Sequence, residues 1–552
     1  MALLPLALLP RRLARRAASS YNNCSLLLVA RGKKSTRTSS SSSISSSSCC
    51  SLAVSVRRAN FASASYSSSD NTTTTTTTTT IHCPIAEELD RVIGLRTKNN
   101  SSSWVVESNV SALHSKYDEL SKEDKAKFLS LLATRHAVDH DRICELSKKL
   151  ACTEPSSLNR LLTREKALKD ALQPPYHWFF ARVGRLKDGV KFLVDMRANL
   201  LETMNQLPRD SSDLLMLGQM DATLKELLFL WFSVGFLKIE RVTWETPCDI
   251  LQKVSDYEAI HPVRNWTDLK KRVGPYRRCF IFTHPSMPRE PLVVLHTALC
   301  DIIPESVKGI EESEKRIREK AGNKKNIEDE TNIKAAIFYS IASTQSGLQG
   351  IELGNYLIKQ VAKHITTEFP EVNQLSSLSP IPNFRVWLLD KMKRDVNTIF
   401  TEKEQVTLKN VLGFDENSNN SSNNLYTEMK KIFNNSLWSN NKQLTDILKE
   451  PLLRSCAWYL FKEKRRNYAL NGVANFHLKN GAVMWRINWM ADPTPRGMAN
   501  SCGIMVNYRY YLNETKSNST NYIENFYIKA SEDIDELAKK AEKIMISSNQ
   551  SV

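Results

Sequence analysis

The stretch whose residue types most directly suggest chemistry contains three closely spaced glycines. Gly347, Gly350 and Gly354 follow an apolar, β-branched and aromatic run, which predicts a strand at Ala335–Ala342. Apolar residues then recur at helical spacing (Leu353, Leu357, Ile358 and Val361), which predicts a helix from near Gly350 to His364. A strand, a glycine turn and a helix together present backbone N–H groups and a positive helix end to a phosphate. The turn therefore predicts a phosphate-holding loop, although such turns also occur without ligands. It is neither a Walker A loop nor a dinucleotide fingerprint.

A serine and a histidine further along the chain are the main catalytic candidates. Ser379 lies in Ser376–Pro382 (SSLSPIP), where two prolines predict a rigid turn, and a serine before a proline is often only a turn former. His477 is flanked by Asn475 and Asn480. A histidine whose tautomer is held by neighbouring amides is a suitable general acid near neutral pH. A buried histidine with its hydrogen bonds satisfied is the alternative.

Three further residues are secondary candidates. Glu352, inside the glycine turn, can orient a catalytic partner or simply be a carboxylate favoured at a helix N-terminus. Tyr510 is a candidate hydroxyl for the site. Cys248 follows Thr246 and Pro247, which predict a helix with Thr246 at the N-cap and Pro247 at N1. A thiol in the first turn of a helix is easier to ionise.

The cysteines give no metal-ligand pattern. The eleven cysteines are scattered, with no CxxC pair and no histidine at zinc spacing. We therefore expect mostly reduced cysteines, many of them in the core, and no metal site.

The formal net charge of +17 is concentrated at the start of the chain. Residues 1–69 hold ten Lys or Arg and no Asp or Glu, so the rest is only mildly basic. Such a body fits an anionic ligand such as a nucleotide and does not require a polyanionic partner. No alternation of aromatic and basic residues remains to bind nucleic acid, so we expect no nucleic-acid partner.

Residues 1–80 are predicted to be a mitochondrial targeting leader followed by a low-complexity linker. Met1–Ser19 places leucines and arginines on opposite sides of a helix, and an Arg- and Ser-rich, acid-free stretch follows. A secretory signal is the rival, but Arg15 and Arg16 interrupt its apolar run. The Ser/Thr tract, ending at Thr80, cannot bury enough apolar surface to become ordered.

These features predict the mitochondrial matrix as the location, with the cytoplasm as the alternative. The last residues, Asn549–Val552, are not a peroxisomal signal. No apolar run approaches the ~18–20 residues of a transmembrane helix, so we expect no membrane association.

Two domains are expected after the linker, which makes the chain an α+β multidomain protein. Residues 81–232 have apolar residues at helical spacing and no β-branched runs, which predicts an all-α helical bundle for support, assembly or docking. Residues 233–552 mix strands and helices, which predicts a mixed α/β catalytic domain. Further strands are expected at 237–244, 278–283, 291–299, 485–489 and 503–512, helices at 384–392 and 531–546, and a solvated charged insert at 305–330.

Seven contiguous stretches carry a family resemblance. They are His261–Trp266 (HPVRNW), Arg272–Cys279 (RVGPYRRC), Glu290–His296 (EPLVVLH), Gly347–Gly354 (GLQGIELG), Ser376–Pro382 (SSLSPIP), Val473–His477 (VANFH) and Trp485–Asp492 (WRINWMAD). Through them the chain from about Gln173 to Glu532 resembles the malonyl-CoA decarboxylase family. The glycine turn is also similar, with altered spacing, to the coenzyme A loop of acetyl-CoA N-acyltransferases.

The resemblance implies both a fold and an activity. The fold is an N-terminal helical domain followed by an acyltransferase-like (GNAT-like) catalytic domain. The activity is decarboxylation of malonyl-CoA to acetyl-CoA and CO2, a carboxy-lyase reaction that controls malonyl-CoA levels in fatty acid metabolism. It implies no separate cofactor, because coenzyme A is part of the substrate, and a homotetramer in which Cys248 can form an interchain disulfide.

The resemblance also implies the site residues. Ser379 and His477 are the catalytic pair, with His477 as the acid that delivers a proton to C2. Whether Ser379 orients the malonyl carboxylate or accepts a proton stays open. The substrate-binding residues are Gln349, Gly350, Ile351, Glu352, Leu353, Gly354 and Asn355, together with Ser379 and His477.

Two other functional classes are compatible with parts of the sequence. An acyl-CoA-dependent N-acyltransferase would use the same loop but transfer its acyl group to an amine. A mitochondrial nucleic-acid-binding protein is suggested only by the basic charge, most of which lies in the leader.

Overall fold

The computed structural model describes residues 83–97, 102–154, 157–258, 260–320, 322, 328–351, 353–413 and 421–549. The predicted leader and linker at residues 1–80 lie outside the described residues. All that follows concerns the chain from Cys83 onward, which belongs to a single unit that begins at Thr79.

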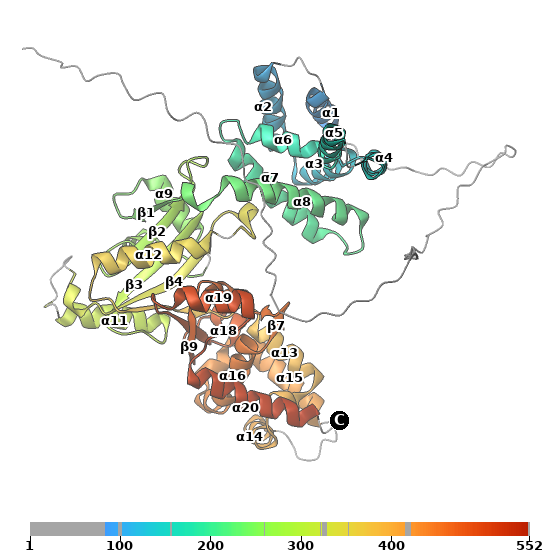
Figure 1. Cartoon of the computed structure of the whole chain (residues 1–552). Helices are drawn as coiled ribbons and strands as arrows, with labels where there is room; N and C mark the ends of the chain where they lie inside the picture. The colour runs from blue at the N-terminus through green and yellow to red at the C-terminus, as the bar shows by residue number, and fades with distance from the viewer. Residues whose placement is uncertain are drawn as a thin grey trace, which may run out of the picture. The chain divides into compact units, whose positions relative to one another are not determined.

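The first part of the described chain is entirely helical, as predicted. Its core is made of leucine, phenylalanine and valine side chains at helical spacing, such as Phe128 and Leu132 on α3 and Leu193 on α7. These helices are coloured blue to green in Figure 1. They are α1 (Ala86–Gly94), α2 (Ser103–Glu119), α3 (Lys122–Arg135), α4 (His140–Ala151), α5 (Leu158–Ala171), α6 (Pro175–Val183), α7 (Gly189–Gln206) and α8 (Ser212–Trp231).

A mixed sheet of eight strands organises the second part, in the order β1-β2-β3-β4-β5-β10-β6, with β9 pairing β10. Only β4 and β5 are parallel; the other pairs are antiparallel. Each of the expected strands is present. The strands are β1 (Lys238–Val242), β2 (Arg277–Thr283), β3 (Val293–Cys300), β4 (Ala335–Ser343), β5 (Gln374–Ser377), β6 (Ser379–Pro380), β9 (Val483–Asn488) and β10 (Met505–Tyr510). A separate pair consists of β7 (Lys464–Arg465) and β8 (Tyr468–Ala469).

Helices cover both faces of this sheet. On one face, Phe338 of β4 and Leu357 of α12 (Gly354–Glu368) belong to the same buried hydrophobic cluster. On the other, Ile337 packs with Ile310 of α11 (Val307–Lys320), the helix of the charged insert. The second face is completed beside β2 by α9 (Cys248–Asp256) and α10 (Trp266–Arg272). Because both faces are covered, β3 is buried along its whole length, which explains why its sequence, VVLHTALC, is mostly apolar.

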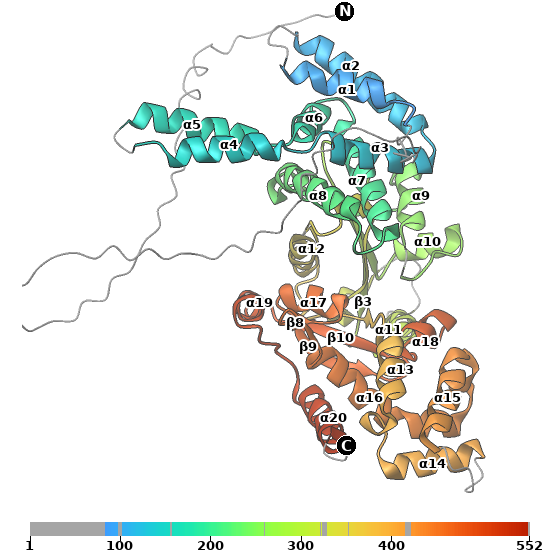
Figure 2. The same ribbon diagram turned by 90° about the vertical axis from the view of Figure 1, so that its right-hand side faces the viewer.

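The remaining helices lie between β6 and the C-terminus, with β9 and β10 among them. In Figure 1 the long helices α16 and α20 run beside each other, and Figure 2 shows α17 next to α19; both pairs are in contact. These helices are α13 (Phe384–Arg394), α14 (Glu402–Leu412), α15 (Ser421–Asn434), α16 (Lys442–Phe461), α17 (Gly472–Lys479), α18 (Pro495–Ser501), α19 (Thr515–Asn525) and α20 (Glu532–Asn549). None of the helices in the described part of the chain has the length and apolar character needed to cross a bilayer.

The segment predicted as a rigid turn at Ser376–Pro382 is instead a strand interrupted at Leu378. Its two halves, β5 and β6, pair with the same edge of β10, where Ser379 lies opposite Val506. The turn prediction is wrong because pairing with a distant strand holds the segment extended. Pro380 is tolerated at the end of β6 because a terminal strand position needs no N–H donor.

The same interruption opens the sheet. β5 pairs in parallel with β4 only as far as Ser377, opposite Phe338. Beyond that point β6 continues along β10, and β4 continues as far as Ser343 with β3. β4 and β6 therefore diverge, and a cavity lies where they separate.

Two helix starts differ from the prediction. The helix after the glycine turn begins at Gly354 rather than near Gly350, because Gly350 has a φ of +79°, which is incompatible with the first turn of a right-handed helix. α9 begins at Cys248, with Pro247 rather than Thr246 at the N-cap. The Thr246 hydroxyl accepts instead from the backbone N–H of Thr243.

Candidate active site

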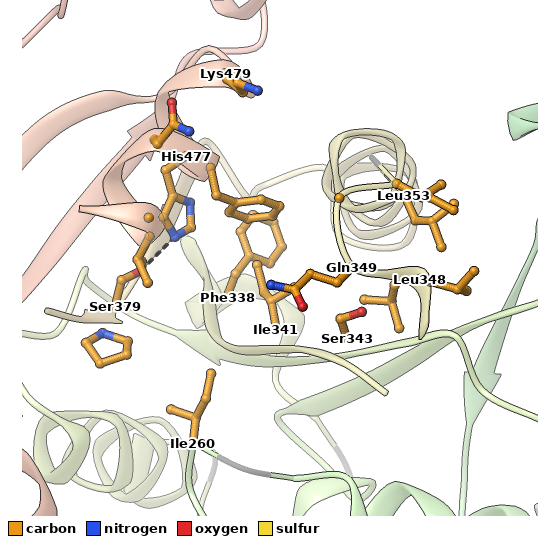
Figure 3. A pocket seen from close by; sticks show the side chains of 18 of the residues that line it. Ile260, Phe338, Ile341, Ser343, Leu348, Gln349, Leu353, Ser379, His477 and Lys479 are labelled. Carbon is orange, nitrogen blue, oxygen red and sulfur yellow. Dashed lines mark hydrogen bonds between the residues drawn. The ribbon is translucent and has the colours of Figure 1, made fainter. Parts of the chain in front are cut away.

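A cavity of about 810 Å³ is lined by the catalytic candidates and by the glycine turn between β4 and α12, the glycine loop. Figure 3 shows Ser379 and His477 on one side, with Leu348 and Leu353 of the loop on the other. The floor between them is apolar, since Phe338 and Ile341 of β4 line it. Of the residues predicted to bind substrate, those lining the cavity are Gln349, Gly350, Ile351, Leu353, Ser379 and His477.

Ser379 and His477 are joined by a hydrogen bond of 2.8 Å between Oγ and Nε2. Ser379 is the first residue of β6, and His477 lies in the last turn of α17, whose N-cap Asn471 accepts from the N–H of Ala474. Both side chains are buried, with exposed fractions of 4% and 3%. Burial lowers the pKa of His477 to about 3, so its imidazole is neutral at physiological pH.

A tyrosine on β10 completes the contacts of the imidazole. The hydroxyl of Tyr510 lies 2.7 Å from Nδ1 of His477. The ring of Tyr508, two residues earlier on the same strand, stacks on the imidazole with centroids 4.5 Å apart. Burial raises the pKa of both tyrosines, so both hydroxyls stay protonated.

The hydrogen-bond directions follow from this arrangement. Tyr510 is buried and its hydroxyl has no other partner in the described part of the chain, so it donates to Nδ1 of His477. A neutral imidazole that accepts at Nδ1 carries its proton on Nε2. His477 therefore donates to the Oγ of Ser379, and the Ser379 hydroxyl proton is left to point elsewhere.

Ser377 supports Ser379 from the neighbouring strand position. The two Oγ atoms lie 2.8 Å apart, and Ser377 Oγ accepts from the backbone N–H of Tyr508 at 3.3 Å. Because the Ser377 oxygen already accepts from the N–H of Tyr508, the Ser377 hydroxyl can donate a hydrogen bond to Ser379 Oγ. Ser379 Oγ then accepts from both neighbours, and its own hydroxyl is free to donate to a ligand in the cavity.

The glycine loop is held from behind by a helix of the N-terminal part. A 3₁₀ turn at Ser346–Leu348 packs against α7, and a Cβ at Gly347 would lie 1.8 Å from the carbonyl oxygen of Val194. The guanidinium of Arg197, also on α7, donates to the carbonyls of Gly347 and Gln349 at 2.5 and 2.9 Å. These contacts require glycine at position 347 and fix the path of the loop.

The other predicted residues fall in several places. Glu352 lies outside the described residues, while Gly354 and Asn355 are the first two residues of α12. Cys248 is exposed at the start of α9. No group of three or more His, Cys, Asp or Glu side chains that could hold a metal ion occurs within the described ranges.

The hypothesis that neighbouring amides hold the tautomer of His477 is wrong. The Asn475 side chain accepts from Tyr522, and the Asn480 side chain donates to the carbonyl of Phe476. Because His477 and its neighbours are on a helix, residues two or three positions away point elsewhere, and the imidazole is reached by Tyr510 instead.

Sequence reasoning missed Ser377, Tyr508 and Arg197 as parts of the site. A signal for Ser377 was available, because residues two positions apart on a strand share a face, and Ser379 is two positions further on. Tyr508 has the same relation to the candidate Tyr510. No local pattern points from Arg197 to the loop, which is 150 positions away.

Comparisons with known proteins agree with this architecture. Residues 136–232 match the family model of the malonyl-CoA decarboxylase N-terminal domain, and residues 235–548 match that of the C-terminal domain. The chain is 46% identical over 417 residues to the mitochondrial malonyl-CoA decarboxylase of Mus musculus, covering 74% of this chain and 81% of that protein. The corresponding protein of Anser anser anser is 45% identical over 417 residues, covering 74% and 79%.

A solved structure is similar as well. The crystal structure of malonyl-CoA decarboxylase from Rhodopseudomonas palustris has a TM-score of 0.69 and 28% sequence identity, covering 82% of this chain and 99% of that one. Sequence and fold thus point to relatives with the same name over most of the chain. The chain belongs to the malonyl-CoA decarboxylase family.

Proposed function

We propose that this chain is a carboxy-lyase that converts malonyl-CoA to acetyl-CoA and CO2, and so controls malonyl-CoA levels in fatty acid metabolism. One observation carries the proposal: the hydrogen-bonded Ser379 and His477 share a cavity with the glycine loop expected to hold coenzyme A. Family membership supports it, because the relatives are named malonyl-CoA decarboxylases.

The reaction sets the demands on the site. Loss of CO2 from a β-carboxyl thioester leaves an enolate whose charge grows on the thioester oxygen. Preorganised donors in a site that excludes water stabilise such charge strongly. The proposed site offers buried hydroxyl and imidazole donors above an apolar floor, which suits a reaction that turns a carboxylate into neutral CO2.

His477 is proposed to deliver the proton to C2. Its imidazole is neutral in the free protein because burial lowers its pKa to about 3. A malonyl carboxylate bound beside it opposes that effect, since a nearby negative charge raises the pKa of an imidazole. Substrate binding would therefore add a second proton to His477 at Nδ1, and the Tyr510 hydroxyl would turn to accept from that N–H and keep the ring oriented. Nε2–H would then supply the proton that C2 needs once CO2 has left.

Ser379 is proposed to orient the malonyl carboxylate. Two hydrogen-bond donors, His477 and Ser377, are aimed at its oxygen, which leaves the Ser379 proton for a ligand. A hydroxyl donor to a carboxylate forms a short, charge-assisted hydrogen bond. This geometry favours carboxylate orientation over the alternative role as proton acceptor.

Coenzyme A is proposed to enter along the loop from Gln349 to Asn355, as part of the substrate, and no further cofactor or metal is required. The strand-loop-helix unit of β4, the glycine turn and α12 supports an acyltransferase-like (GNAT-like) catalytic domain. The divergence of β4 from β6 supports it too, because it leaves the edge of β4 at Tyr339–Ser343 facing the cavity. An extended pantetheine arm with two amides can pair with such an edge.

The proposed location is the mitochondrial matrix, supported by the leader pattern and by relatives named as mitochondrial. The proposed assembly is a homotetramer with an interchain disulfide at Cys248. Its support is that this cysteine is exposed at the start of α9.

The experiment that tests the function uses the purified chain with malonyl-CoA and no amine. We expect equal amounts of CO2 and acetyl-CoA. An N-acyltransferase would instead release coenzyme A only when an amine acceptor is added. Absence of CO2 together with amine-dependent release of coenzyme A would overturn the proposal.

A further inference from the structure

A lysine of the N-terminal helices lies against the glycine loop. A Cβ at Gly350, which lines the cavity, would lie 3.0 Å from Nζ of Lys225 on α8. Gly350 therefore has two constraints, its φ of +79° and the ammonium beside it. Lys225 is half-buried, so its side chain is partly held by its neighbours.

The ammonium of Lys225 has no carboxylate partner in the described chain. The nearest candidate by helical spacing is Asp221, one turn earlier on α8. The Asp221 carboxylate is already occupied, because it accepts from Nε of Arg197 at 2.7 Å. A half-buried ammonium beside a cavity without a counter-charge favours an anion as its partner.

The loop itself is arranged to receive an anion at this point. Arg197 binds the carbonyls of Gly347 and Gln349, which turns these negative ends towards α7 and away from a ligand. The backbone N–H of Gly350 donates to no acceptor among the described residues. An unused N–H and an ammonium thus meet at the same cavity-lining glycine.

We propose that Lys225 binds the diphosphate of the coenzyme A moiety, so that the N-terminal helices supply part of the substrate site. The inference rests on the proposed function and deepens it. Arg197 is a positioning residue in this arrangement, because it acts on the ligand only through the loop. The half of the substrate that reacts is held by Ser379 and His477, while Lys225 holds the half that does not react.

The test compares two substrates that share the reacting end. Malonyl-CoA carries the phosphates, and malonyl-N-acetylcysteamine has the same thioester without any phosphate. We expect Lys225→Ala to raise KM for malonyl-CoA by about tenfold, the loss of one hydrogen bond to a charged group, with kcat little changed. Its kcat/KM for malonyl-N-acetylcysteamine should equal that of the unmodified chain.

Two control variants separate the phosphate contact from structural effects. Lys225→Arg keeps the charge and should keep KM for malonyl-CoA close to normal. Lys191→Ala removes a lysine of the adjacent helix α7 that is paired with Asp195 across an exposed surface, and should leave both substrates unaffected. An unchanged KM in Lys225→Ala, or an equal loss with both substrates, would overturn the inference.

The failure of this inference is distinguishable from failure of the proposed function. If the unmodified chain releases no CO2, the proposed function fails, and the affinity for coenzyme A alone is then measured by titration calorimetry. Binding about tenfold weaker in Lys225→Ala than in Lys191→Ala still supports the inference, and equal binding contradicts it.

Discussion

The imidazole Nε2 of His477 lies 2.8 Å from the hydroxyl of Ser379, although 98 positions separate the two residues in the chain. Three elements create this contact. β6 presents Ser379, α17 presents His477, and β10 pairs with β6 while directing Tyr510 to the far side of the imidazole. The result is a directed chain of donors from Tyr510 through His477 to Ser379, ending in a cavity that the glycine loop also lines.

Removing the hydroxyl of Tyr510 tests whether this direction matters. In Tyr510→Phe nothing donates to Nδ1 of His477, so the imidazole loses its preference for carrying the proton on Nε2. We expect kcat for CO2 release to fall by roughly 10²-fold, the lower end of what a positioned proton donor contributes, with little change in KM. Steady-state kinetics with malonyl-CoA provides the measurement.

Tyr508→Phe is the matched control for this variant. It keeps the ring stacked on His477 and removes a hydroxyl that has no hydrogen-bond partner among the described residues. Its activity should stay close to normal. Equal losses in both variants would show that packing, rather than the Tyr510 hydrogen bond, limits the reaction.

Substrate binding should be accompanied by proton uptake. The pKa of His477 in the free protein, about 3, lies below the ordinary value of about 6.5, so the imidazole is neutral at pH 7. A bound carboxylate raises this pKa, and a raised pKa means that a proton is taken from solvent. We expect titration calorimetry of Ser379→Ala in two buffers of different ionisation enthalpy to show net proton uptake with malonyl-CoA.

Acetyl-CoA is the control ligand, because it has the same coenzyme and no carboxylate. It should bind without proton uptake. The same proton count for both ligands would rule out loading of His477 by the malonyl group.

The close contact between Gly347 and α7 leads to a prediction about stability. In Gly347→Ala the new Cβ would approach the carbonyl oxygen of Val194 to 1.8 Å, so the loop or α7 must move. We expect the free energy of unfolding in urea to fall by about 1–3 kcal/mol, as for other overpacked sites. KM for malonyl-CoA should rise as well, because the loop shifts.

A second glycine, on helix α8 beside α7, provides the comparison. Gly218 lies within α8, and a Cβ there would come no closer than 3.8 Å to Met204. Gly218→Ala should raise the free energy of unfolding by about 0.5–1 kcal/mol, since alanine is the better helix former. A loss of stability in Gly218→Ala as large as that in Gly347→Ala would refute the role assigned to the loop contact.

The proposed interchain disulfide can be examined on gels. Cys248 is exposed, so mild oxidation should convert part of the chain to a dimer that resists SDS and disappears on reduction. Cys248→Ser should remain monomeric under the same conditions. The other exposed cysteines, Cys144 and Cys152, provide control variants that should still form the dimer. Identical monomer bands for the unmodified chain and Cys248→Ser would contradict the proposal.

The elements of the fold were largely predictable from local patterns. The mostly apolar run of β3 is typical of a buried strand, and the spacing of Leu357, Ile358 and Val361 is typical of a helix, so these elements were placed within a few residues of their bounds. β5 and β6 were not predictable in this way. Pro380 and Pro382 suggest a turn locally, and only pairing with β10, more than a hundred positions later, keeps the segment extended.

The residues of the candidate site were also only partly predictable from the sequence. The stretches containing Gly350, Ser379 and His477 could be selected from residue types and family resemblance, and the structure places them around one cavity. The partners of the imidazole could not be selected, because Tyr510 and Tyr508 reach His477 through a sheet register that no local spacing encodes. Arg197 and Lys225 could not be selected either, because they come from helices far earlier in the chain.

The proposed role of His477 is tested by measuring CO2 release from malonyl-CoA by His477→Ala. We expect turnover to fall by at least about 10²-fold, because the group that protonates C2 is missing, while coenzyme A binds with normal affinity at the loop. Normal binding also establishes that the variant is folded. Near-normal CO2 release by His477→Ala would contradict the assignment of His477, and with it the proposed mechanism.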